Sequence, residues 1–235
     1  MQPESLLVVE TAELPRTAAE HVARILTVAV SERGRASVAL SGGSTPRAMH
    51  EALAQVSDVP WDRIDVYFGD ERCVPPEHPD SNYRMAKESL FDRVPLPSHS
   101  IHRPEAERPD RDAAARAYEA ILPSAIDLVV LGIGEDGHTA SLFPGAASLN
   151  EKVRGYIAVT GPKPPPDRLT LTPAALAAAR TLMTLASGAG KAEPVARALR
   201  GAWDPLNTPS QLARRGLWIV DTAAAAQFGH GGAHR

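Results

Sequence analysis

The segment SVALSGGSTP, residues 37–46, carries the clearest signal of the fold. Its first four residues are mostly apolar, which predicts a strand over 37–40. Two glycines follow, and Thr45-Pro46 then predicts a helix start, because proline lacks an N–H that a first helical turn does not need. A strand, a tight glycine turn and a helix together form the repeating unit of α/β folds.

The same alternation extends in both directions from this stretch. A Thr17/Glu20 capping box predicts a helix that Gly34 ends, and Thr172-Pro173 predicts another helix start before an alanine-rich run. Strand followed by helix, repeated along the chain, predicts an α/β fold with a mostly parallel sheet flanked by helices. The further expected strands are 5–10, 64–69, 128–132, 156–160, 181–186 and 217–221, and the further expected helices are 82–91 and 110–122.

Composition limits the functional classes. The chain has 235 residues, 43% hydrophobic and 23% charged, and a net charge of −3. These values are typical of a folded domain, and we expect one catalytic domain over 1–227 and a flexible tail over 228–235. Without a basic excess, nucleic-acid binding is not expected.

The expected location is cytoplasmic. Cys73 is the single cysteine, so no intramolecular disulfide is possible, which fits a reducing compartment. The first residues lack a basic segment and a long apolar run, so no signal peptide is expected. No stretch approaches the roughly 18 apolar residues of a membrane span, so no membrane partner is expected.

Ligands of open α/β sheets bind beyond the carboxyl ends of the strands, which selects the segments 41–45, 70–80, 132–138 and 187–191. In the first, Gly42 and Gly43 allow close backbone approach, and the free amides near Ser44 and Thr45 suit a phosphate. The alternative is a plain strand–helix turn with a good cap, which needs the same residue types. The pattern is neither a Walker A loop nor a nucleophile elbow.

The second segment begins with GDER, residues 69–72. Arg72 suits an oxyanion or a phosphate, and Asp70 or Glu71 suits a partner for Arg72 or for a histidine. The alternative is a surface ion pair.

The third segment, GIGEDGH, fits the G-x-G-x-x-G pattern at 132–137. A dinucleotide site is not expected, because Glu135 and Asp136 stand where a pyrophosphate would lie and Pro144 ends the next helix too early. The segment instead displays Asp136 and His138. A neutral imidazole suits a general base, and the alternative is a histidine that caps a turn.

Two cations complete the candidate site. Arg168 and Lys191 both lie at expected strand ends. Each alone suits a solvated surface charge, but together with the glycine turn they favour an anionic substrate.

Five segments together resemble the family that contains 6-phosphogluconolactonases and glucosamine-6-phosphate deaminase-like proteins. They are SGGSTP at 41–46, GDERCVPPEHPDSNYRMAKE at 69–88, LGIGEDGHTASLFPG at 131–145, DRLTLT at 167–172 and GAGKA at 188–192. The resemblance implies a Rossmann-like domain that hydrolyses 6-phosphoglucono-1,5-lactone in the oxidative pentose phosphate pathway, without a metal or other cofactor.

On this hypothesis the first glycine turn, Arg168 and Lys191 hold the substrate phosphate. His138 takes a proton from the water that attacks C1, Arg72 or a loop amide stabilises the oxyanion, and Asp136 or Asp70 orients the imidazole. The protein is expected to act as a monomer or small homo-oligomer on this small molecule.

The sequence is also compatible with two other functions. A sugar-phosphate isomerase or deaminase would use the same phosphate site but move a proton between carbons. A sugar-phosphate sensor would not need His138. A zinc hydrolase is disfavoured because no HExxH motif or Cys/His cluster is present.

Overall fold

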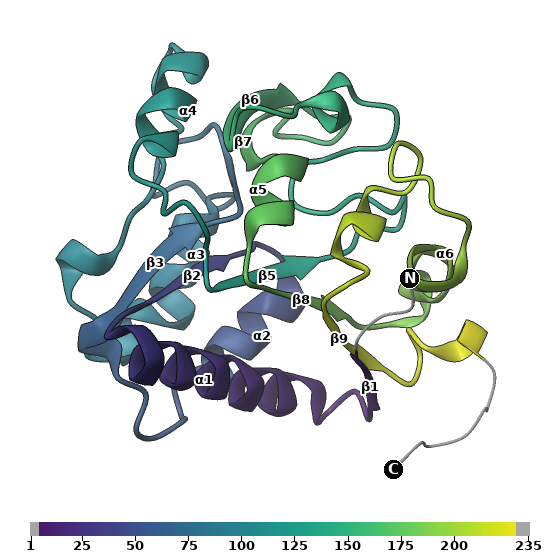
Figure 1. The fold of residues 1–235 in the computed structure, drawn as a ribbon, viewed down its shortest axis with the longest axis horizontal. Helices are drawn as coiled ribbons and strands as arrows, with labels where there is room; N and C mark the ends of the chain where they lie inside the picture. Colours follow the sequence, from purple (N-terminus) through teal and green to yellow (C-terminus); the bar gives the residue numbers. More distant parts are fainter. Residues whose placement is uncertain (1–4, 229–235) are drawn as a thin grey trace.

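The computed structural model describes residues 5–228, and its centre is a parallel sheet of six strands (Figure 1). Every pairing in this sheet is parallel. The predicted mostly parallel α/β fold is therefore confirmed. In spatial order the strands are β1 (Ser5–Val9), β9 (Leu217–Asp221), β8 (Thr181–Ala186), β5 (Leu128–Gly132), β2 (Ala36–Leu40) and β3 (Ile64–Phe68).

Helices cover both faces of this sheet. Neighbouring side chains of β2 point to opposite faces, so Val38 and Leu40 join one apolar core while Ala39 joins the other. Burial on both faces explains why the strands are nearly continuous apolar runs. One core contains α1 (Leu14–Arg33), α2 (Ser44–Leu53) and α3 (Asn82–Ser89); the other contains α4 (Arg111–Glu119), α5 (Pro173–Ala178) and α6 (Ala192–Arg200).

A second, antiparallel sheet lies over the α5 side of the first and was not expected from the sequence (Figure 1). It orders β4 (Asp70–Arg72), β7 (Asp167–Leu171) and β6 (Tyr156–Thr160), of which only β6 was predicted. Gly69 joins the two sheets, since its N–H donates to Leu40 of β2 (2.8 Å) and its carbonyl accepts from Leu171 of β7 (2.8 Å). The chain thus leaves β3 and carries Asp70 and Arg72 into the second sheet.

Two predicted helix starts are wrong. The α1 helix begins at Leu14, and the Thr17 amide already donates to the Glu13 carbonyl (2.9 Å), so Thr17 and Glu20 form no capping box. Pro15 lies in the first turn instead. The α2 helix begins at Ser44, two residues before the predicted first helical residue Pro46, with Gly43 as the cap.

Other boundaries differ by a few residues. Gly34 ends α1 with a φ of 79°, as predicted, and Thr172 caps α5 through the Ala175 amide. The helices expected over 82–91 and 110–122 are shorter in the structure, where they are α3 and α4. The short helix expected before Pro144 is absent, because a β-bridge between Thr139 and Leu142 occupies that segment. The 3-10 turns are Trp61–Arg63, Phe91–Arg93, Ser98–Ser100, Ala147–Asn150, Ala189–Lys191, Pro209–Ala213 and Ala226–Phe228.

The predicted tail over 228–235 lies, from residue 229 on, outside the described residues. Among residues 5–228, no helix has the length and apolar character needed to cross a membrane.

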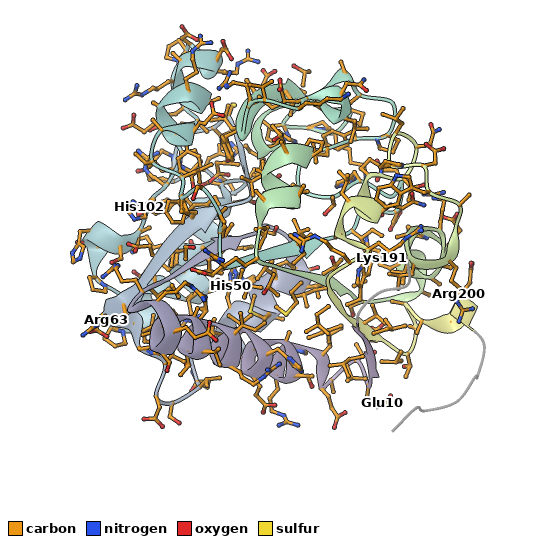
Figure 2. All side chains as sticks on the ribbon, in the orientation of Figure 1. Glu10, His50, Arg63, His102, Lys191 and Arg200 are labelled. Atoms are coloured by element: carbon orange, nitrogen blue, oxygen red, sulfur yellow. The ribbon has the colours of Figure 1, made fainter. Side chains whose placement is uncertain are left out.

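Stability should depend on pH through His50, which is fully buried between α2 and α3 (Figure 2). Its Nδ1 contacts Ser89 Oγ at 3.1 Å, and burial lowers its pKa from 6.5 to about 4. Below pH 6.5 the unfolded chain binds a proton that the folded chain does not. The free energy of unfolding should therefore fall by about 3 kcal/mol between pH 6.5 and pH 4.

Urea denaturation across this range measures the effect. The His50→Gln variant should lose this part of the pH dependence, although it starts from a lower stability. An unchanged pH slope in the variant would contradict the assignment.

Candidate active site

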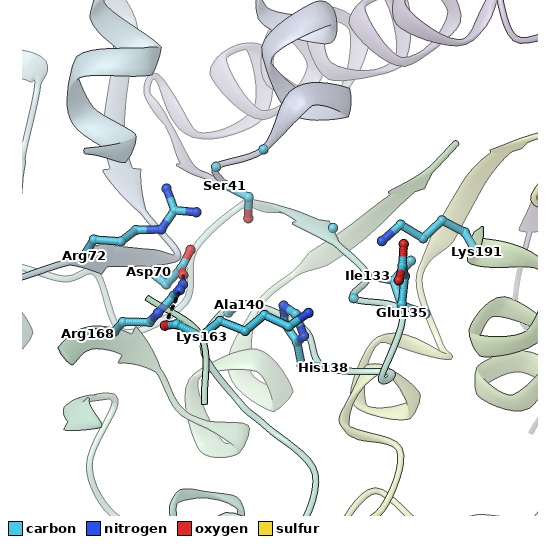
Figure 3. Close-up of a pocket in the computed structure, with 14 residues that line it drawn as sticks. Ser41, Asp70, Arg72, Ile133, Glu135, His138, Ala140, Lys163, Arg168 and Lys191 are labelled. Carbon is cyan, nitrogen blue, oxygen red and sulfur yellow. Dashed lines mark hydrogen bonds and ion pairs between the residues drawn. The ribbon is translucent and has the colours of Figure 1, made fainter. Parts of the chain in front are cut away.

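A pocket of about 330 Å³ lies at the carboxyl ends of the parallel strands, where the sequence placed it (Figure 3). All four predicted segments contribute to its wall, and the second sheet closes one side. The residues that line it are Ser41, Gly42, Gly43, Asp70, Arg72, Gly132, Ile133, Gly134, Glu135, His138, Ala140, Lys163, Arg168 and Lys191.

The N-terminus of α2 opens beside Gly42 and Gly43. Gly43 has a φ of 106°, a conformation that side chains rarely adopt. Within residues 5–228, the amides of Ser44 and Thr45 donate to no protein acceptor, which suits an anion at the positive end of the helix. Of the predicted phosphate-binding turn, Gly42 and Gly43 line the pocket, whereas Ser44 and Thr45 do not.

Asn82 organises the β4 side of the pocket and was not among the site residues expected from the sequence. Its side chain donates to the Asp70 carbonyl (2.8 Å) and accepts from Arg72 Nη1 (2.5 Å). Arg72 Nη1 also donates to the Asp80 carbonyl (2.9 Å). A Cβ on Gly42 would lie 1.9 Å from Asn82 Oδ1, so the glycine permits this contact.

Glu71 has a structural role. Its buried carboxylate accepts from the amides of Asn82 (2.7 Å) and Tyr83 (2.8 Å) at the start of α3. Burial raises its pKa, against the lowering effect of these hydrogen bonds. Glu71 therefore ties β4 to α3 and contacts neither Arg72's guanidinium nor a histidine.

Asp136 is the carboxylate that contacts the imidazole. Its Oδ1 lies 2.5 Å from His138 Nδ1 and also accepts from the His138 amide at 3.2 Å. Asp70 instead accepts from Ser141 Oγ at 2.6 Å and lies 4.0 Å from Arg168. Of the two alternatives that the sequence left open, the geometry favours Asp136, although Asp136 does not line the pocket.

The electrostatics favour a neutral imidazole. Burial lowers the pKa of His138 below 6.5, although Asp136 opposes this by favouring the charged form, and Lys163 adds to the lowering. With Nδ1–H held by Asp136, the other ring nitrogen is left free to accept a proton.

Glycines shape the loop that holds this pair. The Gly134 amide donates to the His138 carbonyl (2.8 Å), and Gly137 has a φ of 88°. A Cβ on Gly134 would lie 2.0 Å from His138 Nδ1. Arg197 of α6 fixes the loop from outside by donating to the Asp136 carbonyl at 3.0 Å.

Arg168 lies on β7 and is buried. Its Nε donates to the Pro165 carbonyl (3.1 Å) and its Nη2 to the Lys163 carbonyl (3.4 Å). The guanidinium also lies 5.7 Å over the Phe143 ring. Arg168 therefore lines the pocket as predicted, and two of its N–H donors hold the 161–166 loop.

Lys191 follows β8 and lies across the pocket from Arg168 in the view of Figure 3. Its ammonium makes no ion pair or hydrogen bond within the part of the chain that the structure describes. It is therefore available to an anionic ligand.

Two further residues, Lys163 and Glu135, line the pocket and were not expected there from the sequence. Lys163 lies in the 161–166 loop, to which no function was assigned, although a lysine between prolines was visible there. Glu135 was used only to exclude a dinucleotide. It packs over the Gly190 backbone, where a Cβ would lie 3.1 Å from Glu135 Oε1.

Two possible nucleophiles are in poor positions. Ser141 is fully buried against Asp70. Burial raises the pKa of the half-buried Cys73 thiol to about 11, so it is not a thiolate at neutral pH.

Among residues 5–228, no three His, Cys, Asp or Glu side chains gather in a way that could hold a metal ion.

Comparison with known proteins places the chain in a family. Residues 9–220 match the family described as glucosamine-6-phosphate isomerases/6-phosphogluconolactonase. The chain belongs to this family. The resemblance predicted from five sequence segments is thus confirmed.

Several members of the family are close relatives over nearly their whole length. The 6-phosphogluconolactonase of Streptomyces coelicolor is 39% identical, covering 88% of each chain. The 6-phosphogluconolactonase of Nostoc is 38% identical, covering 86% of this chain and 89% of its own. That of Mycobacterium tuberculosis is 36% identical, covering 92% of this chain and 94% of its own.

Solved structures agree with the family fold. The 6-phosphogluconolactonase from Trypanosoma brucei superposes with a TM-score of 0.85 at 26% identity, covering 97% of this chain and 100% of its own. A monomeric glucosamine-6-phosphate deaminase superposes with a TM-score of 0.80 at 22% identity, covering 94% of this chain and 99% of its own. At that identity the likeness shows the fold alone.

Gly134 offers a test of the His138–Asp136 geometry. A methyl group at Gly134 would displace the imidazole, so Gly134→Ala should lower kcat on the family's lactone substrate by about 10²-fold or more while the fold is kept. Steady-state kinetics with circular dichroism measures this. Gly155→Ala is the matched control, because its Cβ would meet only Glu119 Oε1 at 3.5 Å, an ordinary contact. Equal kcat values in the two variants would show that catalysis does not depend on the position of His138 beside Asp136.

Proposed function

We propose that the chain hydrolyses 6-phospho-D-glucono-1,5-lactone to 6-phospho-D-gluconate, the lactonase step of the oxidative pentose phosphate pathway, with His138 as general base. The relatives named 6-phosphogluconolactonase support the activity. The observation that carries the mechanism is the neutral His138, held by Asp136 at 2.5 Å, in a pocket bordered by cations and a free helix N-terminus.

The bond changes follow from the position of this pair. His138 takes a proton from water through the ring nitrogen that does not face Asp136, as the water oxygen bonds to C1 and the carbonyl electrons move onto oxygen. The tetrahedral intermediate then collapses, the bond from C1 to the ring oxygen breaks, and His138 returns the proton to that oxygen. Asp136 keeps the reactive tautomer in place and favours the imidazolium between these steps.

The substrate phosphate would be held away from the reacting carbon. Gly42, Gly43 and Lys191 border the pocket and would donate to a dianion there. The free amides of Ser44 and Thr45 begin the helix that follows these glycines, and its positive end would favour the same anion. Arg168 adds positive charge while it also holds the 161–166 loop. Binding at this remote group orients C1 toward His138.

We also propose that the reaction needs no metal and that residues 1–227 act as one catalytic unit. The bond changes above require only protein groups and water, and both sheets supply pocket residues. Activity that survives EDTA treatment would support the first proposal, and EDTA inactivation reversed by a divalent metal would refute it.

The decisive experiment is a coupled assay with freshly made phosphorylated lactone, which follows the release of 6-phosphogluconate and is corrected for spontaneous hydrolysis. Enzyme-dependent acid release supports the proposal. Incorporation of solvent deuterium at a substrate carbon, without acid release, would favour the isomerase or deaminase reaction instead.

The pH profile should identify His138 as the base. His138→Ala should lower kcat by about 10²-fold or more. Asp136→Asn should also lower kcat, and because it removes the charge that raises the His138 pKa, the acid limb of kcat/KM should move to lower pH. An acid limb that stays in place or moves upward would contradict this pairing.

Lys191 should act mainly in binding. Lys191→Ala should raise KM for the phosphorylated lactone by about tenfold or more with little change in kcat, because the phosphate lies away from C1. Lys152→Ala, at an exposed lysine outside the pocket, is the control. An unchanged KM in Lys191→Ala would remove Lys191 from the phosphate site.

A further inference from the structure

Lys163 is an exposed lysine whose side chain borders the same pocket as His138. In Figure 3 it extends from its loop toward the imidazole. Over residues 5–228, its ammonium has neither an ion pair nor a hydrogen bond. A charged group at the mouth of a pocket with no protein partner is available to the ligand.

The loop that carries Lys163 is held in place. Proline precedes Lys163 and three prolines follow it, and each fixes its own φ. The Gly161 amide donates to the Pro166 carbonyl at 2.7 Å, which closes the loop. Arg168 donates to the carbonyls of Pro165 and of Lys163 itself. The backbone of Lys163 therefore has a defined position, and only its side chain must be ordered by a ligand.

The other cations of the pocket are committed elsewhere or lie farther from the imidazole. Arg72 donates to Asn82 and to the Asp80 carbonyl. Arg168 holds the loop and lies near Asp70. Lys191 lies on the opposite side of the pocket in Figure 3.

The electrostatics of the pair agree with this placement. The charged groups that act on His138 are Asp136 and Asp70, which raise its pKa, and Lys163, which lowers it. Lys163 likewise lowers the pKa of Asp136. Its ammonium thus lies close enough to influence both members of the pair.

We propose that Lys163 is a further catalytic residue, whose ammonium stabilises the oxyanion that forms at C1 when water adds to the lactone. This role rests on the proposed function and replaces Arg72 as the expected oxyanion donor. The ammonium keeps all its protons. On collapse the oxyanion electrons re-form the carbonyl at C1 and the departing ring oxygen takes the proton from His138, after which the carboxylic acid product releases its own proton to solvent. A cation placed where negative charge develops lowers the barrier more than it improves substrate binding.

The test compares Lys163→Gln and Lys163→Arg with the parent enzyme in the coupled lactonase assay. Lys163→Gln should lower kcat by about 10²-fold while KM changes by less than about threefold. Lys163→Arg, which keeps the charge, should recover most of the loss. Lys152→Gln, an exposed lysine outside the pocket, should behave like the parent.

The pH profile adds a readout that a structural role would not move. Removing the positive charge in Lys163→Gln should raise the His138 pKa, so the acid limb of kcat/KM should move to higher pH. Ionisation of the substrate phosphate affects both enzymes equally. A difference between their pH profiles therefore reflects a changed pKa in the protein. Lys163→Arg should leave the limb near its original position.

Three outcomes would overturn the proposal. An unchanged kcat in Lys163→Gln would remove Lys163 from the reaction. A raised KM with an unchanged kcat would make it a phosphate ligand. A lowered kcat that Lys163→Arg does not restore, with an unmoved acid limb, would indicate a structural effect. If the parent enzyme does not hydrolyse the lactone, the proposed function fails, whereas these outcomes in an active parent refute only the role of Lys163.

Discussion

The candidate site depends on one contact, the 2.5 Å approach of Asp136 Oδ1 to His138 Nδ1. It selects the tautomer whose other nitrogen is basic, and burial keeps that imidazole neutral. The contact is possible only because Gly134 leaves the space that both side chains occupy. Gly137, with its positive φ, turns the chain so that residues two apart can meet. The glycines that resemble a dinucleotide motif thus allow a carboxylate and an imidazole to come together.

The pocket around this contact forms because the chain passes directly from the parallel sheet into the antiparallel sheet at Gly69. After β3 the chain passes through Gly69, which bonds to both sheets, and continues as β4. The carboxyl ends of the parallel strands then face the second sheet instead of open solvent. Glu71, buried under the start of α3, holds β4 in this position at the cost of desolvating its carboxylate. The resulting cavity is bordered by four cations and is suited to a phosphorylated ligand.

Arg168 both lines the pocket and holds the 161–166 loop. A buried guanidinium requires several acceptors, and here two of them are carbonyls of the 161–166 loop. Phe143 contacts both the guanidinium and the His138 ring, at centroid distances of 5.7 and 4.8 Å. The loop, the arginine and the imidazole therefore form one packed group, and the position of Lys163 follows from it. The deaminase that shares this fold shows that the fold alone does not select the reaction.

The sequence by itself determined the parallel sheet, its strands within a residue or two, and the four segments that meet at the pocket. Apolar periodicity and the rule for strand ends are local or topological signals, so one sequence suffices to read them. Only the tertiary structure decided that Asp136 rather than Asp70 contacts His138, that Asn82 rather than a carboxylate holds Arg72, and that Lys163 enters the pocket. It also revealed β4 and β7, whose partners are distant in sequence. Strands β4 and β7 pair across a long stretch of sequence, and no local pattern predicts such a pairing. Asp136 and Asp70 are chemically equivalent, so only the packing of the folded chain decides which of them contacts His138.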